Sequence, residues 1–155
     1  MKRFIFLDID GVLNSCNLRE RQYVPGTKII GVEDKPLRNL KKVYEAYQGL
    51  NIILVSTWKF HWSVNKSEQG YQGNYLDMRF SEYGMSISDK SEDEVFNRGA
   101  GIKTYLSGYI GCKWVVIDDC VAADYDTEIK EHLVQTDYKI GLSGLDAGKA
   151  IEILK

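Results

Sequence analysis

Short apolar runs recur along the chain, and each has the length of one strand. The runs are Arg3 to Leu7, Asn51 to Val55 and Trp114 to Ile117, and a last strand is expected at Leu133 to Thr136. Continuous apolar runs that lack alternating polar residues are typical of strands buried on both faces. The pattern therefore predicts a sheet covered on both sides.

Helical spacing of apolar residues lies between these runs. The segments predicted to be helices are Leu37 to Tyr47, Arg98 to Leu106, Asp126 to His132 and Asp146 to Leu154. Asp34, Lys35 and Pro36 favour a helix start before the first of them, and Gly49 favours a stop after it. Arg98 to Leu106 is predicted to be helical despite Gly99 and Gly101.

Two segments carry weaker patterns. Asn14 to Lys35 is rich in glycine and polar residues and is predicted to be mainly a loop. The segment from Trp58 to Asp93 is predicted to hold a helix, a loop and a short strand near Met85 to Ile87. Strands that alternate with helices imply parallel βαβ units, so we expect an α/β fold in one domain spanning residues 1–155. In such sheets ligands bind at the carboxyl ends of the strands.

Composition narrows the class of protein. A chain of 155 residues with 44% hydrophobic and 27% charged residues is ordinary for a soluble globular domain. The formal net charge of -2 argues against nucleic-acid binding by the whole surface, although a local basic cleft is compatible with it.

The cysteines and the N-terminus give no sign of export. Three cysteines without a CxxC pair favour neither a disulfide framework nor a zinc site, and they predict reduced thiols in a cytoplasmic protein. The first apolar run is interrupted by two aspartates, which is unlike a signal peptide or a membrane span. His61 and His132 are isolated and have no metal-ligand spacing.

Small polar or acidic residues follow three predicted strands at the point where each strand ends. They are Asp8 and Asp10, then Ser56 and Thr57, then Asp118 and Asp119. Each pair alone is more often a turn or a helix cap, but the carboxyl ends of parallel strands lie side by side. Four carboxylates in one crevice need a counter-charge, and an all-oxygen site suits Mg²⁺ with room for a substrate phosphate.

The spacing of the first acid pair carries a further expectation. Two residues along a strand return a side chain to the same face, so a strand continuing this far would bring Asp8 and Asp10 together. Crowding would then favour a protonated form of one of them.

Three motifs in this order resemble those of the haloacid dehalogenase (HAD) superfamily. FLDIDGVLN resembles the first motif, hhhDxDGxhx; VSTW resembles the second, and VVIDDC the fourth. GVLN, STWK, the Arg98-Gly99 pair, IDD and the tail from Thr136 to Leu142 resemble a small-phosphatase branch. That branch includes phosphatase domains attached to nucleic-acid repair enzymes. The resemblance implies a HAD-like Rossmannoid three-layer fold, with a central parallel sheet and helices on both faces.

The resemblance also implies roles for the acids. Asp8 would be the nucleophile that forms an aspartyl-phosphate, and Asp10 the general acid and then the base that activates water. Asp8 and the backbone carbonyl of Asp10 would bind Mg²⁺, and Asp118 and Asp119 would complete the metal shell.

The phosphate-binding hydroxyl and the phosphate-binding cation each have two candidate residues. Ser56 would hydrogen-bond a phosphoryl oxygen, with Thr57 as the other candidate, and Gly11 would allow the tight turn after the acids. A cation near a helix start would steady the phosphoryl group, and Arg98 is preferred to Lys103.

The motif spacing predicts no full cap domain. About 23 residues separate Asn14 from Leu37 and about 40 separate Trp58 from Arg98, which is too few for a cap beside the core elements. We therefore expect an open crevice, which suits bulky substrates such as nucleic-acid ends or phosphoproteins and also admits small phosphate esters.

The segment TWKFHW, from Thr57 to Trp62, is open to two interpretations. In the first, its aromatic residues stack a base at the rim of the site with Lys59 near a phosphate. In the second, which is favoured, they pack against the sheet.

The leading hypothesis is a Mg²⁺-dependent phosphomonoesterase that acts through an aspartyl-phosphate. The alternative enzyme is a phosphatase specific for nucleic-acid 3′ or 5′ ends. A receiver-type switch and a non-catalytic scaffold are less favoured, because the DxD lies on the first strand and all four acids are present.

Overall fold

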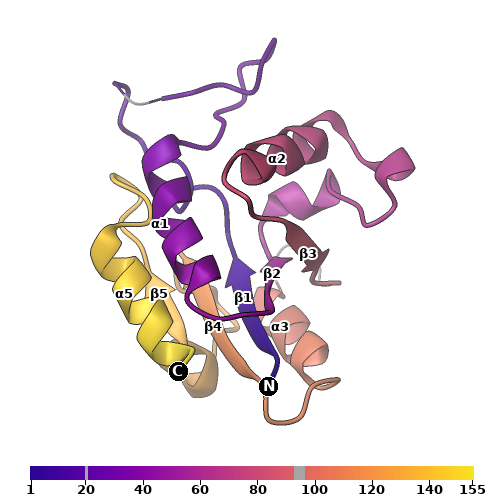
Figure 1. The fold of residues 1–155 in the computed structure, drawn as a ribbon, viewed down its shortest axis with the longest axis vertical. Helices are drawn as coiled ribbons and strands as arrows, with labels where there is room; N and C mark the ends of the chain where they lie inside the picture. The colour runs from indigo at the N-terminus through magenta and orange to yellow at the C-terminus, as the bar shows by residue number, and fades with distance from the viewer. Residues whose placement is uncertain (20, 93–96) are drawn as a thin grey trace.

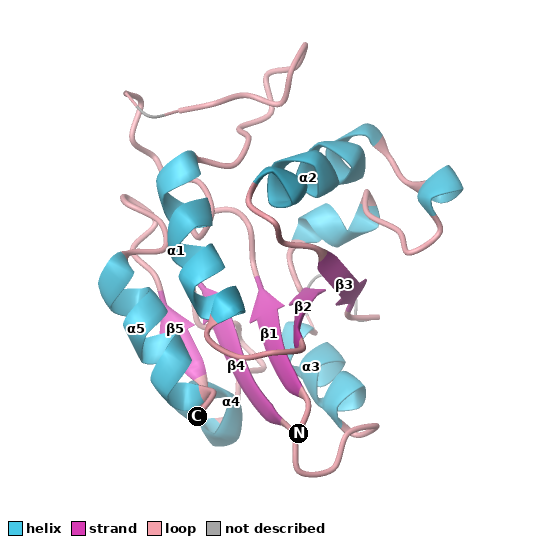
Figure 2. Ribbon diagram, viewed as in Figure 1, coloured by secondary structure: helices cyan, strands magenta, loops and turns pink. Residues whose placement is uncertain are grey.

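The structure is a computed structural model that describes residues 1–19, 21–92 and 97–155. Its strands form one five-stranded parallel sheet in the order β3-β2-β1-β4-β5 (Figure 2). The strands are β1 (Arg3–Leu7), β2 (Leu50–Leu54), β3 (Ile87–Lys90), β4 (Lys113–Asp118) and β5 (Leu133–Gln135). The predicted parallel α/β sheet is confirmed.

Helices lie between successive strands, and one more follows the last strand. They are α1 (Asp34–Glu45), α2 (Tyr71–Glu82), α3 (Arg98–Leu106), α4 (Thr127–Glu131) and α5 (Gly144–Ile153), with short 3₁₀ helices η1 (Thr57–Phe60) and η2 (Lys66–Glu68). Each of the four predicted helices is present; α3 has the predicted bounds, and the ends of the other three are shifted by one to three residues.

The two faces of the sheet are covered by different helices (Figure 1). Ile5 and Leu7 of β1 pack in the core cluster that includes buried side chains of α1, α2 and α5. Phe4 and Phe6 point to the opposite face, where α3 and α4 supply Ile102 and Ile129 among other residues. This alternation along a strand produces the three-layer arrangement expected from the sequence.

Two predicted elements are present but begin at other residues than predicted. The third strand begins at Ile87, where the prediction had it end, because Gly84 turns the chain after α2 and the Met85 N–H still bonds to Phe80. The last helix begins two residues before the predicted Asp146. Ser143 and Asp146 form a reciprocal capping box, which places the first turn at Gly144.

Two predicted ranges extend over residues that the structure does not describe. The predicted segment that ends at Asp93 and the predicted loop that contains Glu20 each include a residue outside the described ones. Between Trp58 and the third strand, the described chain forms η1, η2 and α2.

The carboxyl edge of the sheet carries no separate cap domain in the described residues. The described part of residues 15–33 and residues 61–82 instead form two short excursions beyond this edge, visible at the top of Figure 1. A search of the described residues finds no helix with the length and apolarity needed to cross a bilayer.

Candidate active site

Strand register brings the polar strand ends together. Leu7 of β1 lies opposite Leu54 of β2 on one side and Ile117 of β4 on the other. The Asp8 N–H continues this ladder by donating to Ile117, at 2.9 Å. Asp8 therefore lies at the central position of the carboxyl edge, between the ends of β2 and β4.

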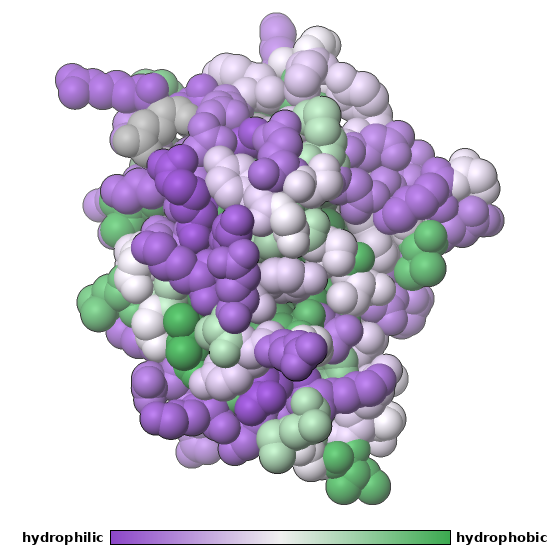
Figure 3. Space-filling view, in the orientation of Figure 1, coloured by the Kyte–Doolittle hydropathy of each residue, from purple (hydrophilic) through white to green (hydrophobic). Residues whose placement is uncertain are grey.

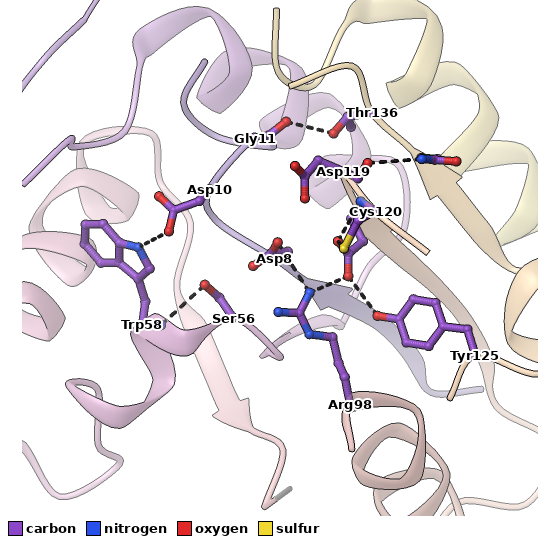
Figure 4. Close-up of polar contacts among 12 residues, drawn as sticks. Asp8, Asp10, Gly11, Ser56, Trp58, Arg98, Asp119, Cys120, Tyr125 and Thr136 are labelled. Carbon is purple, nitrogen blue, oxygen red and sulfur yellow. Dashed lines mark hydrogen bonds and ion pairs between the residues drawn. The ribbon is translucent and has the colours of Figure 1, made fainter. Parts of the chain in front are cut away.

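An arginine lies between two buried carboxylates at this edge (Figure 4). Arg98 Nη1 is 2.5 Å from Asp118 Oδ2 and 3.4 Å from Asp8 Oδ2. The hydroxyl of Tyr125 donates to the same Asp118 oxygen at 2.8 Å. Asp118 is fully buried, so its charge is balanced by these two donors and by Cys120, whose N–H donates to the other carboxylate oxygen at 3.0 Å, instead of by water.

The electrostatics of this cluster raise the pKa values of both Asp8 and Arg98. Burial raises the pKa of Asp8 to about 7; the charge of Arg98 opposes the rise, and the charge of Asp118 adds to it. Burial by itself lowers the pKa of Arg98, but the charges of Asp8 and Asp118 outweigh it and raise that pKa above its usual range. The arginine is therefore a permanent cation beside a carboxyl group that titrates near neutral pH.

Asp10 does not crowd Asp8 in the way that the spacing predicted. Its Oδ2 accepts a hydrogen bond from Trp58 Nε1 at 3.0 Å, and its Oδ1 accepts one from Asn14 Nδ2 at 2.8 Å. Figure 4 shows the Asp10 side chain turned toward Trp58. The strand ends at Leu7, so its two-residue period does not extend to Asp10, and the like charge that raises the pKa of Asp8 is that of Asp118.

Gly11 makes the turn that follows the acids. Its φ of +77° is strained for residues with a side chain, and a Cβ there would lie 2.5 Å from Asp119 Oδ2. Its carbonyl accepts a hydrogen bond from Thr136 Oγ1 at 2.8 Å. The predicted tight turn is thus packed directly against the second acid of the β4 pair.

The structure distinguishes between Ser56 and Thr57. Ser56 is fully buried, and its hydroxyl lowers the pKa of Asp8 by hydrogen bonding. Thr57 is exposed at the start of η1. Ser56 is therefore the hydroxyl that lies beside Asp8.

The structure also distinguishes between the two candidate cations. Arg98, in the first position of α3, contacts Asp8 and Asp118. Lys103 is exposed and pairs with Asp126, with Glu128 at 4.0 Å. Lys103 therefore belongs to a surface ion pair away from the carboxyl edge.

The aromatic segment after β2 mostly packs against the sheet. Trp58 and Trp62 are buried in the core, and Lys59 is buried with its ammonium 3.2 Å from Ser91 Oγ. Phe60, by contrast, keeps 56% of its surface exposed. The packing interpretation holds for the two tryptophans, whereas Phe60 keeps an exposed ring.

The acids at the β4 end suit a hard cation. Asp118, Asp119 and Cys120 each present one potential ligand atom within 4.8 Å of the others. Burial and the charge of Asp118 raise the pKa of Cys120 to about 12, so this thiol stays protonated and is a poor ligand at neutral pH. The carboxylate oxygens of Asp118 and Asp119 remain, a donor set that fits Mg²⁺.

Sequence reasoning missed several partners of the predicted residues. Tyr125 and Thr136 each hold a site group by one hydrogen bond, Asn14 donates to Asp10 and accepts from the Gly11 N–H, and the Trp58 indole orients Asp10. Thr136 reaches Gly11 from the end of β5, and Tyr125 reaches Asp118 from the irregular loop seven residues after it, so no regular spacing indicated either residue.

These features define a Rossmann-like α/β protein with an acidic edge and one partly buried arginine, as the resemblance implied. The model of one family, the HAD domain in Swiss Army Knife RNA repair proteins, matches residues 4–147, and the chain belongs to this family. The family implies a phosphatase-type hydrolase with aspartate-based chemistry. Searches of curated proteins and of solved structures gave no significant match.

Proposed function

We propose that the protein is a Mg²⁺-dependent phosphomonoesterase that removes phosphate from RNA ends through an aspartyl-phosphate intermediate. The observation that carries this proposal is the position of Asp8, which is buried at the central strand end beside Arg98 and Ser56. A nucleophile there faces both a cation and a hydroxyl donor suited to phosphoryl oxygens.

The first half of the reaction transfers the phosphoryl group to Asp8. A carboxylate oxygen of Asp8 attacks phosphorus, and the bond from phosphorus to the leaving oxygen breaks with its electron pair going to that oxygen. Asp10 supplies the proton that the leaving oxygen takes up. The hydrogen bonds from Trp58 and Asn14 hold the Asp10 carboxyl in place for this transfer.

The second half releases phosphate. Asp10, now deprotonated, accepts a proton from water, and the water oxygen attacks phosphorus and displaces Asp8. Arg98 and the Ser56 hydroxyl stabilise the charge on the phosphoryl oxygens in both halves. Asp8 emerges as a free carboxylate, and Asp10 again carries the proton.

Four groups would hold the metal ion: the carboxylates of Asp8, Asp118 and Asp119 and the backbone carbonyl of Asp10. Mg²⁺ bound there supplies positive charge that offsets the carboxylates and draws the substrate phosphate to the edge.

A basic pocket supports RNA as the substrate, beside the family's occurrence in RNA repair proteins. Four cations line a pocket of about 400 Å³: Arg19, Arg21, Lys35 and Arg38. Within the described residues none of these side chains makes a hydrogen bond or an ion pair. The acids that also line the pocket are engaged elsewhere, Glu33 by Ser15 and Asp34 by Arg79.

Figure 3 shows hydrophilic side chains gathered over α1, the helix that contributes two of these cations. A local basic surface on a chain with a net charge of -2 matches the requirement for binding backbone phosphates.

The test is phosphate release from an aryl phosphate and from RNA with a 3′- or 5′-terminal phosphate, with and without Mg²⁺. Metal-dependent turnover by the wild type, lost in Asp8→Asn and Asp10→Asn, is expected. Repeated turnover on RNA ends, faster than on the aryl phosphate, is the expected preference. One labelling event per molecule without turnover would point instead to a switch, and neither labelling nor turnover would point to a scaffold.

A further inference from the structure

A pocket of about 520 Å³ opens beside Asp10 at the carboxyl edge of the sheet. Besides Asp10 and Trp58, its lining comprises Ile29, Ile30, Thr57, Phe60, His61 and Gln72. These residues come from the excursion of residues 15–33, from η1 with the residue that follows it, and from the first turn of α2. The reaction described above uses only Asp10 and Trp58 of this set.

The walls of the pocket combine an exposed aromatic ring with unused hydrogen-bonding groups. The half-exposed ring of Phe60 and the exposed side chain of Ile29 provide apolar surface. Within the described chain, the side chains of Thr57, His61 and Gln72 have no hydrogen-bond partner. The described lining contains no lysine or arginine, so it does not suit a second phosphate. A flat, uncharged group with a polar edge, such as a nucleobase, matches this surface.

Contacts between the two excursions hold the pocket open without a ligand. Tyr71 donates its hydroxyl hydrogen to the Pro25 carbonyl at 2.6 Å, and the Val32 N–H donates to the Tyr75 hydroxyl at 3.0 Å. Both tyrosines belong to α2, so this helix fixes the excursion that carries Ile29. A preformed pocket binds with less loss of conformational entropy.

The position of Asp10 identifies which part of a substrate reaches the pocket. If Asp10 protonates the leaving oxygen, the group attached to that oxygen lies on the Asp10 side of the reacting phosphorus. We propose that the pocket binds the terminal nucleoside of a single-stranded RNA, with its base stacked on Phe60. This inference rests on the proposed function and specifies its substrate, because the leaving group of an RNA-end phosphatase is that terminal nucleoside.

The experiment measures RNA binding, so that it is separate from catalysis. Fluorescence anisotropy gives the Kd of a labelled single-stranded RNA for the Asp8→Asn protein, with the phosphate at the 3′ end in one arm and at the 5′ end in the other. Adding Phe60→Ala is expected to raise the Kd by about tenfold in the arm that matches the enzyme's polarity, since one base loses its stacking surface. Phe60→Tyr should retain the affinity of the parent protein, because it keeps the ring.

Two controls make the result specific. Ile110→Ala removes another exposed apolar side chain, located just before β4 at the opposite edge of the sheet, and should leave the Kd unchanged. An RNA whose phosphorylated terminal nucleotide lacks its base should bind equally well with and without the Phe60→Ala substitution. The inference is overturned if Phe60→Ala leaves the Kd unchanged in both arms, if it weakens the abasic RNA just as much, or if no RNA binds.

Failure of the proposed function and failure of the inference about the pocket give different experimental results. If the wild type binds RNA through Phe60 but releases no phosphate, the inference about the pocket holds and the proposed phosphatase activity is wrong. If the wild type hydrolyses aryl phosphate but does not bind RNA, the phosphatase activity holds and the inference about the pocket is wrong.

Discussion

Single residues in the site are governed by burial and by backbone conformation. Asp8 is only 6% exposed, so its charge depends on one arginine and one neighbouring carboxylate instead of on water. Gly11 occupies a left-handed turn against Asp119 that only glycine fits without displacement. For each of these two residues a substitution can be compared with a matched variant.

The raised pKa of Asp8 makes the stability of the metal-free protein depend on pH. The folded state keeps a proton up to about pH 7, whereas the unfolded chain releases it near the ordinary value of 3.8. The unfolded state therefore binds fewer protons in this window, and the free energy of unfolding falls as pH rises through it, by up to about 4 kcal/mol. Urea denaturation of the wild type in EDTA should show this decline from pH 4 to 7.

The matched variant is Asp8→Asn, which has no proton to lose and should show a flatter profile over the same range. Parallel profiles for the two proteins would mean that Asp8 has an ordinary pKa in the fold.

Substitution of Gly11 should affect both stability and metal binding. Gly11→Ala and Gly49→Ala both place a side chain at a φ near +75°, which costs roughly 1–2 kcal/mol. Only at Gly11 would the new Cβ meet Asp119; at Gly49 no described atom lies within 4 Å. Calorimetric titration with Mg²⁺ should therefore show weakened binding for Gly11→Ala and unchanged binding for Gly49→Ala. Equal Mg²⁺ affinities for Gly11→Ala and Gly49→Ala would mean that Asp119 is not part of the metal site.

At the scale of elements, the first turn of α3 positions the site arginine. The N-cap residue Asn97 makes no side-chain cap, and Asp124 from the loop after β4 instead accepts a hydrogen bond from the Ala100 N–H at 2.9 Å. The helix that carries Arg98 is thus fastened to the strand that ends in Asp118. This close approach requires a glycine, because a Cβ at Gly99 would lie 2.5 Å from the Asp124 carbonyl oxygen.

Two helix glycines should consequently respond in opposite ways to alanine. Gly99→Ala is expected to push α3 from the Asp124 loop, destabilise the fold and lower turnover by at least about tenfold through misplacement of Arg98. Gly148→Ala, within α5 and with open space around it, should stabilise by about 0.5–1 kcal/mol and leave turnover unchanged. Thermal unfolding and initial rates test both; a Gly99→Ala enzyme of normal activity would contradict this role of the loop.

At the scale of the whole molecule, charge is distributed unevenly. The chain carries 20 basic and 22 acidic residues, yet four cations without acidic partners among the described residues line one pocket between α1 and the 15–33 excursion. The Phe60 pocket borders the same excursion through Ile29 and Ile30. One excursion therefore contributes to a basic surface and to an aromatic pocket whose described lining has no lysine or arginine, the two kinds of surface that a single-stranded RNA requires.

The basic pocket predicts a salt-dependent contribution to RNA binding. Arg38→Ala should weaken binding and reduce the slope of log K against log salt by about one, as expected for one lost phosphate contact. Lys41→Ala removes the same charge from the same helix, but Lys41 pairs with Glu45 at 3.5 Å and does not line the pocket, so its slope should stay unchanged. Identical slopes for the two variants would place the RNA elsewhere.

Local pattern along the chain was enough to predict the sheet and most of its acidic edge. Continuous apolar runs of four or five residues are typical of interior strands, and the acids that end them must share one edge once the strands are parallel. Asp8, Asp118 and Asp119 follow from this reasoning, and the spacing between the motifs gave the expectation of no full cap domain. The order of the motifs along the chain was enough to indicate the family.

Packing between distant segments decided which cation reaches the acids and where the Asp10 side chain points. Arg98 and Lys103 lie on one helix, and only the docking of α3 determines which of them meets Asp118. Asp10 follows a strand that ends at Leu7, so its direction depends on an indole at the end of the neighbouring strand. Such contacts join residues tens of positions apart, and their geometry is set by the burial of whole elements and not by the spacing of neighbours in the sequence.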